Sequence, residues 1–355
     1  MVYINIYDVM RSEVVMKAVK IEKPGDISLV EVEMPVAKEN EAVIRIIAAG
    51  ICGSDIGAFR GVNNLVSYPR IIGHELVGEV VSIPFDVKNE KNIQTGDKVI
   101  LEPYLFCGHC YPCSKGRTNC CTNLKVLGVH QDGGIAEYIT HPANMLLKLP
   151  EKMDLTIAPI VEPLSIALHG LHRLRILPGE QIAIFGAGTI GLLAALVAIA
   201  YDAIPILIDV LEPKLTFARK IGIRNTIHLA SENLIEKINA LTNSRGCECV
   251  MEASGANAAI RAALDVVSFA GRIALTGWPK VETQLPTDLI TKKEVDILGA
   301  RNSAGEFEEA INLIYSGKVD AKAILTKTIS LEDVPSVLRD IDQNPSDYLK
   351  VNIIV

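Results

Sequence analysis

The distribution of hydrophobic and polar residues divides the chain into two kinds of segment. From Lys17 to about Leu149, short β-branched runs such as EAVIRIIAAG, GEVVSI and DKVILEPY are separated by Gly, Pro, Asn and Asp. This pattern predicts strands joined by turns. From about Leu164, longer helical segments alternate with short apolar runs, which predicts βαβ units and a parallel, doubly wound sheet.

The second kind of segment ends where the pattern becomes mixed again. After Arg301 we expect a helix from Glu306 to Ser316 and a final strand in LKVNIIV. The predicted fold is therefore α/β, with a discontinuous, mainly β domain formed by residues 1–162 and 302–355. A cofactor domain of residues 163–301 is inserted into it. The strands expected in the inserted domain are QIAIFGAG, IPILIDV, NTIHLA, CECVMEAS, GRIALTG and VDILGAR.

Length and composition agree with two domains and exclude several classes of partner. A chain of 355 residues is long for one core. A net charge of −7 without a dense Lys/Arg cluster argues against nucleic acid. The apolar stretch from Ile182 to Ile208 is interrupted by Asp202 and Pro205, which favours a buried strand–helix–strand unit over a membrane span. Met1 to Arg11 contain polar residues and Asp8 where a signal peptide has its apolar region, so we expect a cytoplasmic protein. Residues 1–15 are either a short extension or the product of an upstream start codon.

Four closely spaced cysteines form the first candidate metal site. Cys107, Cys110, Cys113 and Cys121 follow the spacing C-x2-C-x2-C-x7-C, with Gly and Pro at turn positions between them. Four thiolates complete the tetrahedron around Zn²⁺, so this site is predicted to be structural. Cys120 is the alternative fourth ligand. The other interpretations are a reduced, metal-free loop and a nucleic-acid-binding ribbon, and the charge disfavours the ribbon.

A second candidate metal site is open and combines three ligand types. Cys52 lies in GICGSD, His74 and Glu75 in GHELVG, and Glu162 in VEPL. A thiolate, an imidazole and a carboxylate leave one zinc position free for water or an alcohol. His74 and Glu75 can both face the metal only if a turn precedes them, which Gly73 permits. The segment HELVG lacks the second His of the metalloprotease motif HExxH.

A glycine-rich loop, GAGTIG, follows the predicted strand QIAIF and precedes a helix. Gly186 permits the tight turn, Gly188 lets a pyrophosphate approach the backbone, and Gly191 lets helix and strand pack closely. The predicted dinucleotide contacts at the helix N-terminus include Thr189 and Ile190.

Asp209 ends the next predicted strand and selects between the two nicotinamide cofactors. A carboxylate there accepts hydrogen bonds from ribose hydroxyls and repels a 2′-phosphate, which favours NAD over NADP. Lys214 is close enough in sequence to contact the adenosine ribose. The alternative is that Asp209 is only a turn residue at the end of a strand.

These motifs, in this order, resemble the zinc-containing medium-chain alcohol dehydrogenase family over the chain from Met16 onward. VEPLSIALHG looks like the polyol and sorbitol dehydrogenase branch. SYPRIIGHE, GRTNCC, GVHQDGGIAEY and GARNS look closest to bacterial oxidoreductases of sugar acids such as L-galactonate. The resemblance implies a GroES-like catalytic domain, a Rossmann domain, two zinc ions per subunit and a homodimer or homotetramer. It also implies that Glu75 or Glu162 reaches the zinc only in some states.

The expected reaction is oxidation of a secondary hydroxyl on a polyol or sugar acid. Zinc acts as a Lewis acid on the hydroxyl, Ser54 relays the proton, and NAD accepts the hydride. Asp55 is expected to orient a metal ligand. Many family members carry a proton-relay His where this chain has Gly57, so the proton must leave by another route. His130 is expected to be a solvated loop residue rather than a substrate contact.

Two alternatives to this function remain. An amino-alcohol substrate, as in L-threonine dehydrogenases, is the alternative within enzymes, although VEPL favours polyols. A non-catalytic family member is the alternative of a different class, and it is disfavoured because all the candidate ligands of both zinc sites are present.

Overall fold

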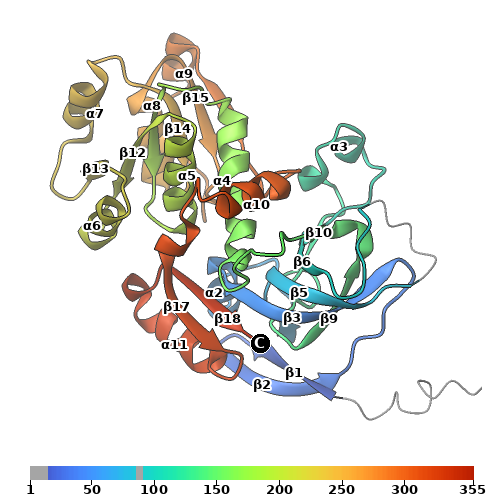
Figure 1. Cartoon of the computed structure of the whole chain (residues 1–355). Helices are drawn as coiled ribbons and strands as arrows, with labels where there is room; N and C mark the ends of the chain where they lie inside the picture. Colours follow the sequence, from blue (N-terminus) through green and yellow to red (C-terminus); the bar gives the residue numbers. More distant parts are fainter. Residues whose placement is uncertain (1–14, 85–90) are drawn as a thin grey trace, which may run out of the picture. The chain divides into compact units, whose positions relative to one another are not determined.

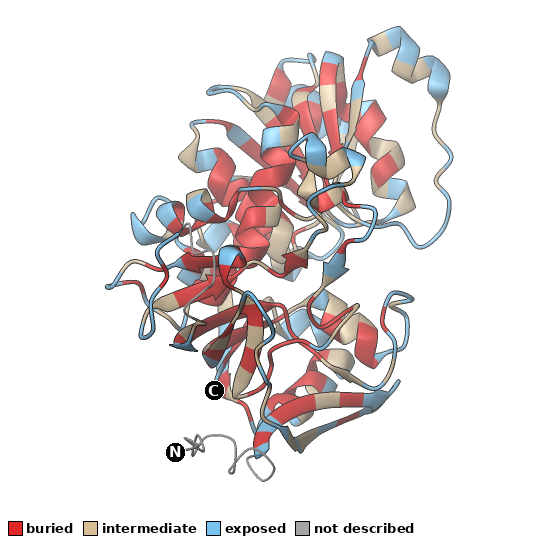
Figure 2. Ribbon diagram, turned by 90° about the vertical axis from the view of Figure 1, so that its right-hand side faces the viewer, coloured by how far each residue is buried: buried red, intermediate tan, exposed pale blue. Residues whose placement is uncertain are grey.

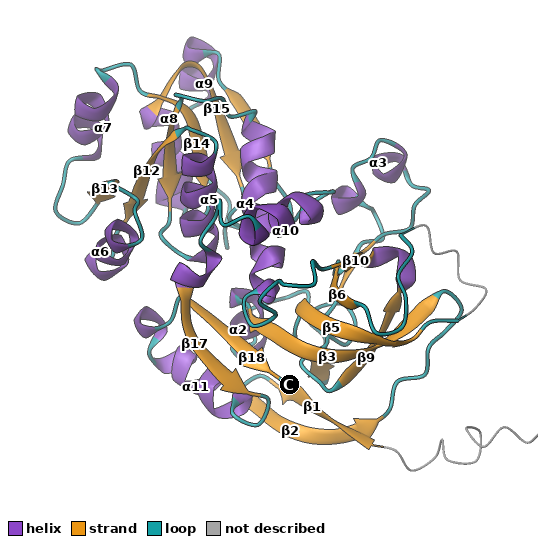
Figure 3. Cartoon of the chain, in the orientation of Figure 1, coloured by secondary structure: helices purple, strands orange, loops and turns teal. Residues whose placement is uncertain are grey.

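The computed structural model describes residues 15–84 and 91–355, and the chain forms two compact units. The first unit contains the described residues of Met1–Gly108, Thr122–Ile160 and Leu325–Val355, and the second contains His109–Cys121 and Val161–Ile324. Strands dominate the first unit, whereas helices and strands alternate in the second (Figure 3). This confirms the predicted α/β class, with a mainly β part and a parallel-sheet part.

The units differ from the predicted domains at three places, one of which is the short stretch of Val161 and Glu162, now in the second unit. Residues 302–324 belong to the second unit, because helix α10 (Phe307–Tyr315) packs against α4 (Val161–Leu174). The cysteine-rich segment His109–Cys121 also belongs there. Its Asn119 side chain donates to the carbonyl of Arg301 at 2.6 Å.

The first unit contains two larger, antiparallel-rich sheets and a small two-stranded sheet formed by β7 and β8. Of the two antiparallel-rich sheets, the larger has the order β10-β6-β5-β3-β18-β17, with β9 also paired to β3, and the smaller has the order β2-β1-β4. The C-terminal strand β18 lies between β3, to which it is antiparallel, and β17, to which it is parallel. The strands are β1 (Val15–Lys23), β2 (Asp26–Glu33), β3 (Glu41–Ile51), β4 (Arg70–Ile71), β5 (Glu75–Ser82), β6 (Lys98–Leu101), β7 (Tyr104–Leu105), β8 (Lys125–Val126), β9 (Tyr138–Pro142), β10 (Leu146–Lys148), β17 (Leu325–Ser330) and β18 (Lys350–Ile354).

Short helices and one longer helix complete this unit. They are α2 (Gly53–Phe59), α11 (Val334–Gln343) and the 3₁₀ turns η2 (Ala143–Met145), η3 (Ala158–Ile160) and η5 (Pro345–Asp347). The apolar residues of alternating strand positions meet in one core that includes Ile44, Ile46, Leu76 and Ile353. Figure 2 shows buried residues concentrated in the central strands, as expected for sheets with one face on a core.

The second unit contains a six-stranded parallel sheet of order β13-β12-β11-β14-β15-β16. This is the doubly wound order in which the strand sequence reverses next to the first strand. The strands are β11 (Gln181–Phe185), β12 (Ile204–Asp209), β13 (Asn225–His228), β14 (Cys247–Glu252), β15 (Val267–Leu275) and β16 (Asp296–Gly299). Cys247 and Cys249 are fully buried in β14, and burial raises the pKa of each thiol to about 12.

Helices cover the second unit's sheet, and Figure 1 shows α5 and α4 against its strands. Helix α5 is apolar around most of its circumference and is buried, as the strand–helix–strand interpretation of residues 182–208 predicted. Among the described residues, no helix combines the length and apolarity needed to cross a membrane. The remaining helices are α3 (Tyr111–Ser114), η1 (Thr118–Cys120), α5 (Thr189–Ala200), α6 (Glu212–Lys220), α7 (Leu234–Thr242), α8 (Asn257–Val266), α9 (Thr287–Lys293) and η4 (Ala321–Ile324).

Candidate metal and cofactor sites

The open site brings Cys52, His74 and Glu75 together, with one ligand atom from each within 4.8 Å of the others. The pairing of β3 with β5 is responsible, because it places Gly50 opposite Glu75, and Cys52 follows β3 directly. His74 and Glu75 are 5% and 1% exposed, so the donors converge in a buried place. Thiolate, imidazole and carboxylate donors are a set that fits zinc.

Two glycines make this convergence possible. Gly73 has φ +101°, a conformation that favours glycine, and it supplies the turn expected before His74. A side chain there would also collide with Ile135. At Gly50 a Cβ would overlap Oε2 of Glu75, so the bare backbone leaves room for that carboxylate.

Asp55 connects the two segments that carry the candidate ligands, and its predicted role of orienting a metal ligand stays a prediction. Its Oδ2 accepts from the backbone N–H of Cys52 at 2.9 Å, and its Oδ1 accepts from that of Gly73 at 3.3 Å. Oδ1 also lies 4.0 Å from Nδ1 of His74. Burial raises the pKa of this carboxyl, and the nearby His74 opposes that effect. The Ser54 hydroxyl lies 3.5 Å from Nε2 of His74, on the other side of the ring.

Lys350 is a site residue that sequence reasoning missed. Its side chain is 2% exposed, its Nζ forms an ion pair with Oε2 of Glu75, and it donates to the carbonyl of Ile51 at 3.1 Å. The sequence did contain one signal for a buried ion pair, which was the single lysine inside the apolar C-terminal segment LKVNIIV. A lysine in a strand predicted to be buried needs a partner.

Glu162 lies outside this group of three, in the second unit, in the first turn of α4. It is 1% exposed, and its backbone carbonyl accepts from the Ser165 hydroxyl at 2.6 Å. It follows η3 by two residues, and η3 packs on β3 and β5, the strands next to Cys52 and Glu75. Its role as a ligand stays a prediction.

The four cysteines expected to hold structural zinc form the second group of ligand atoms within 4.8 Å. Sγ of Cys110 lies 3.4 Å from that of Cys113 and 3.8 Å from that of Cys121. Cys120 is not part of the group, and its Sγ instead accepts from Arg117 at 3.7 Å. The donor set of four thiolates fits zinc and leaves no position for substrate.

The glycine loop has the expected strand–loop–helix context, between β11 and α5. Gly186 has φ +102°, and a Cβ on Gly191 would overlap the Gly186 carbonyl, so both positions need glycine. A Cβ on Gly188 would meet nothing within 4 Å, which leaves space at the helix N-terminus for a phosphate. Thr189 and Ile190 form the first turn of α5.

Asp209 ends β12 beside this loop. Oδ2 accepts from the N–H of Ala187 at 2.7 Å, and Oδ1 accepts from that of Leu211 at 2.9 Å. The carboxylate thus both shapes the glycine loop and closes the turn after its own strand. Lys214 is half-buried in the first part of α6. In the first unit, the His130 ring accepts from the N–H of Val126 at 3.1 Å, and Gly57 lies within α2.

Comparison with known proteins agrees with this architecture. The model "Alcohol dehydrogenase GroES-like domain" matches residues 38–151, and "Zinc-binding dehydrogenase" matches residues 189–316. Over 338 residues the chain is 51% identical to an uncharacterized zinc-type alcohol dehydrogenase-like protein of Haemophilus influenzae, covering 95% of this chain and 98% of that one. The chain therefore belongs to the zinc-type medium-chain alcohol dehydrogenase family.

Relatives with named activities lie further away. Sorbitol dehydrogenase of Bacillus subtilis is 33% identical, with 95% of this chain and 97% of that one covered. L-galactonate-5-dehydrogenase of Escherichia coli is 34% identical, with 86% and 89% covered. A crystal structure of an alcohol dehydrogenase from E. coli CFT073 with NADH has 31% identity and a TM-score of 0.90, covering 96% and 99%. The protein is a zinc-type, NAD(P)-dependent alcohol dehydrogenase, with a GroES-like domain and a Rossmann domain.

Proposed function

We propose that the chain oxidises a secondary hydroxyl of a polyol or sugar acid. Cys52, His74 and a glutamate, either Glu75 or Glu162, hold the catalytic zinc. The observation that carries the proposal is the convergence of three different ligand types, which leaves one coordination position open. When bound, zinc supplies Lewis acidity that polarises the substrate hydroxyl.

The chain's own residues then handle position and protons. Asp55 fixes the backbone on both sides of the site and so orients Cys52 and His74. Ser54, beside the His74 ring, is placed to take the hydroxyl proton and pass it toward solvent. Oxidation breaks one C–H and one O–H bond, so the hydride goes to NAD⁺, the proton leaves, and the secondary alcohol becomes a ketone.

The other candidate sites serve the same reaction. Cys107, Cys110, Cys113 and Cys121 hold the structural zinc. The glycine loop of residues 186–191 binds the NAD pyrophosphate, and Asp209 and Lys214 bind its adenosine ribose. Named relatives that act on sorbitol and L-galactonate support the choice of substrate class.

The test is a screen for NADH formation, followed at its absorbance maximum, with and without a zinc chelator. The substrates are hexitols, pentitols, aldonates and L-threonine. We expect turnover with a polyol or an aldonate, its loss on chelation, and its loss in Cys52→Ser with NAD binding retained. Full activity of that variant, or turnover with L-threonine alone, would contradict the proposal.

A further inference from the structure

The second unit contains a pocket of about 330 Å³ at the carboxyl ends of β15 and β16. Pockets of this size bind small molecules or parts of them. The pocket is lined by Leu275–Pro279 and Gly299–Arg301, together with Arg117, Cys120 and Arg173. Its lining residues therefore come from the cysteine-rich segment His109–Cys121, from α4 and from the ends of two strands, all within the second unit.

Three arginines give this pocket a positive charge. Arg117, Arg173 and Arg301 all line it, and its lining contains no carboxylate. None of the three forms an ion pair with a carboxylate among the described residues. Arginines outside the pocket do pair: Arg175 lies 2.7 Å from Asp296, and Arg272 pairs with Glu180. The pocket thus concentrates like charges for which the described residues provide no carboxylate partner.

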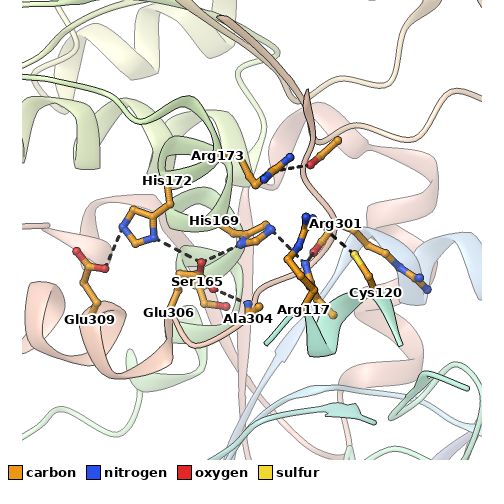
Figure 4. A network of polar contacts seen from close by, with 12 residues as sticks. Arg117, Cys120, Ser165, His169, His172, Arg173, Arg301, Ala304, Glu306 and Glu309 are labelled. Atoms are coloured by element: carbon orange, nitrogen blue, oxygen red, sulfur yellow. Dashed lines mark hydrogen bonds and ion pairs between the residues drawn. The ribbon is translucent and has the colours of Figure 1, made fainter. Parts of the chain in front are cut away.

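The fold fixes these side chains in place, as Figure 4 shows for the region around Arg117, Arg173 and Arg301. Nε of Arg173 donates to the carbonyl of Gly299 at 3.1 Å, and Arg117 contacts Sγ of Cys120. The guanidinium of Arg301 lies 5.9 Å from the centre of the Trp278 ring.

Several polar groups at this pocket still lack a partner. Nε of Arg117, Nε of Arg301 and the hydroxyl of Thr276 are buried without a hydrogen-bond partner in the described part of the chain. Guanidinium groups bind carboxylates and phosphates with paired hydrogen bonds. An oxyanion bound in this pocket would balance the positive charge and would accept hydrogen bonds from the unsatisfied donors.

The position of the pocket relates it to the cofactor. All six strands are parallel, so the ends of β15 and β16 lie at the same sheet edge as the glycine loop after β11. Asp209 lies on one side of β11 in the sheet order, and the pocket lies on the other. With the adenosine ribose at Asp209, the reacting end of the dinucleotide extends toward β14–β16.

We propose that Arg117, Arg173 and Arg301 form a binding site for a small hydroxylated anion that carries a carboxylate or a phosphate. This inference rests on the proposed dehydrogenase function, and among the polyols and sugar acids named there it selects the molecules that carry an anionic group. Sugar acids and sugar phosphates share the feature that the site would recognise, which is an oxyanion at one end of a hydroxylated carbon chain.

Trp278 offers a readout that needs no turnover, because it lines the pocket and is the single tryptophan of the chain. The experiment follows its fluorescence in the full-length, zinc-loaded protein at constant ionic strength. The titrants are D-gluconate, sorbitol 6-phosphate, inorganic phosphate and neutral sorbitol. We expect a saturable change with at least one anionic sugar and none with sorbitol, and the responding sugar identifies the carboxylate or the phosphate as the source.

Substitutions test whether the arginines themselves are responsible for anion binding. Arg117→Gln and Arg301→Gln should each weaken anion binding about tenfold, the effect of one lost charge-assisted hydrogen bond. Arg175→Gln, which removes a paired arginine outside the pocket, should leave binding unchanged. Calorimetry repeats the measurement where Arg301→Gln alters the fluorescence amplitude, and circular dichroism verifies that the variants fold.

Three results would overturn the inference. They are equal binding by sorbitol and the anions, unchanged anion affinity in both glutamine variants, and competitive displacement of the anion by ADP-ribose. The last would assign the arginines to the cofactor's own phosphates. The Cys52→Ser variant should bind the anion normally while lacking turnover, so failure of the proposed catalytic site and failure of the anion site are distinguishable.

Discussion

Lys350 and Glu75 lie 275 positions apart in the sequence, and their side chains form an ion pair in the interior of the first unit. Both side chains are almost fully buried, at 2% and 1% exposed. Glu75 is also one of the three ligands grouped at the candidate catalytic site. The lysine therefore balances the charge of a carboxylate that is a candidate ligand for a metal cation.

Replacing this lysine should make folding depend more on zinc. Lys350→Met leaves a buried carboxylate without its partner, a change that typically costs about 3–5 kcal/mol. A bound cation can replace the lost charge, so the loss should be largest in zinc-stripped protein. Thermal unfolding of Lys350→Met and of the unmodified protein, each with and without zinc, measures this dependence on zinc. If removing zinc destabilises Lys350→Met and the unmodified protein equally, the charge-balancing role is wrong.

The cysteine lobe should control stability more than chemistry. Cys113→Ser removes one thiolate from a closed set of four, and we expect loss of one of two zinc ions and a melting temperature lower by roughly 5–10 °C. Cys120→Ser is the matched control, because its sulfur lies in the same segment but outside the group. Metal analysis and calorimetry of both variants should show a clear difference, and similar behaviour would argue against the assigned ligand set.

Asp209 should set the choice between the two nicotinamide cofactors. Asp209→Asn keeps an oxygen that can accept from the glycine-loop N–H but removes the charge that repels a 2′-phosphate. We expect the ratio of kcat/KM for NAD over NADP to fall about tenfold or more. Steady-state rates with each cofactor provide the ratio. An unchanged ratio would leave Asp209 as a residue that only shapes the loop.

The His169–Glu306–His172 cluster predicts a pH dependence of stability. His172 lies 3.4 Å from Oε1 of Glu306, and this hydrogen bond raises the pKa of the imidazole. Burial alone would raise the pKa of Glu306, but hydrogen bonds from His169 and His172 outweigh it and lower that pKa. The stabilisation from His172 is thus fully present below its unfolded pKa of about 6.5 and is lost as pH rises through its higher folded pKa.

The variant His172→Gln should therefore lose more stability at pH 5.5 than at pH 8.5. His172 is partly exposed, which screens the effect, so we expect a difference below about 1 kcal/mol. Urea unfolding at both pH values measures it, and Arg175→Gln serves as a nearby surface control. An equal loss at both pH values would show that the imidazolium does not contribute.

What could be predicted from the sequence was the local part of the architecture. The alternation of helical and strand-like segments predicted the parallel sheet, and the glycine loop depends on residues close together in the chain. The spacing of the cysteines predicted a group of four thiolates but left Cys120 and Cys121 as alternatives for the fourth. Gly73 was also predictable, because two neighbouring ligands required a turn.

Long-range pairing set the limit of prediction. Lys350 reaches Glu75 only because β18 pairs with β3, and no local pattern specifies that register. The three arginines of the pocket come from the cysteine-rich segment His109–Cys121, from α4 and from the end of β16, and only the fold brings them together. Residues 302–324 belong to the second unit because α10 packs on α4, a contact that the hydrophobic periodicity of the sequence does not reveal.

The late position of β18 in the sequence has a consequence for the order of folding. The second unit ends at residue 324, so the residues of its parallel sheet are all synthesised before β18. The first unit needs β18, because this strand pairs with β3 and carries Lys350, the partner of Glu75. We therefore expect the parallel sheet to fold first during synthesis, and the surroundings of Glu75 to be completed only after β18 has been added.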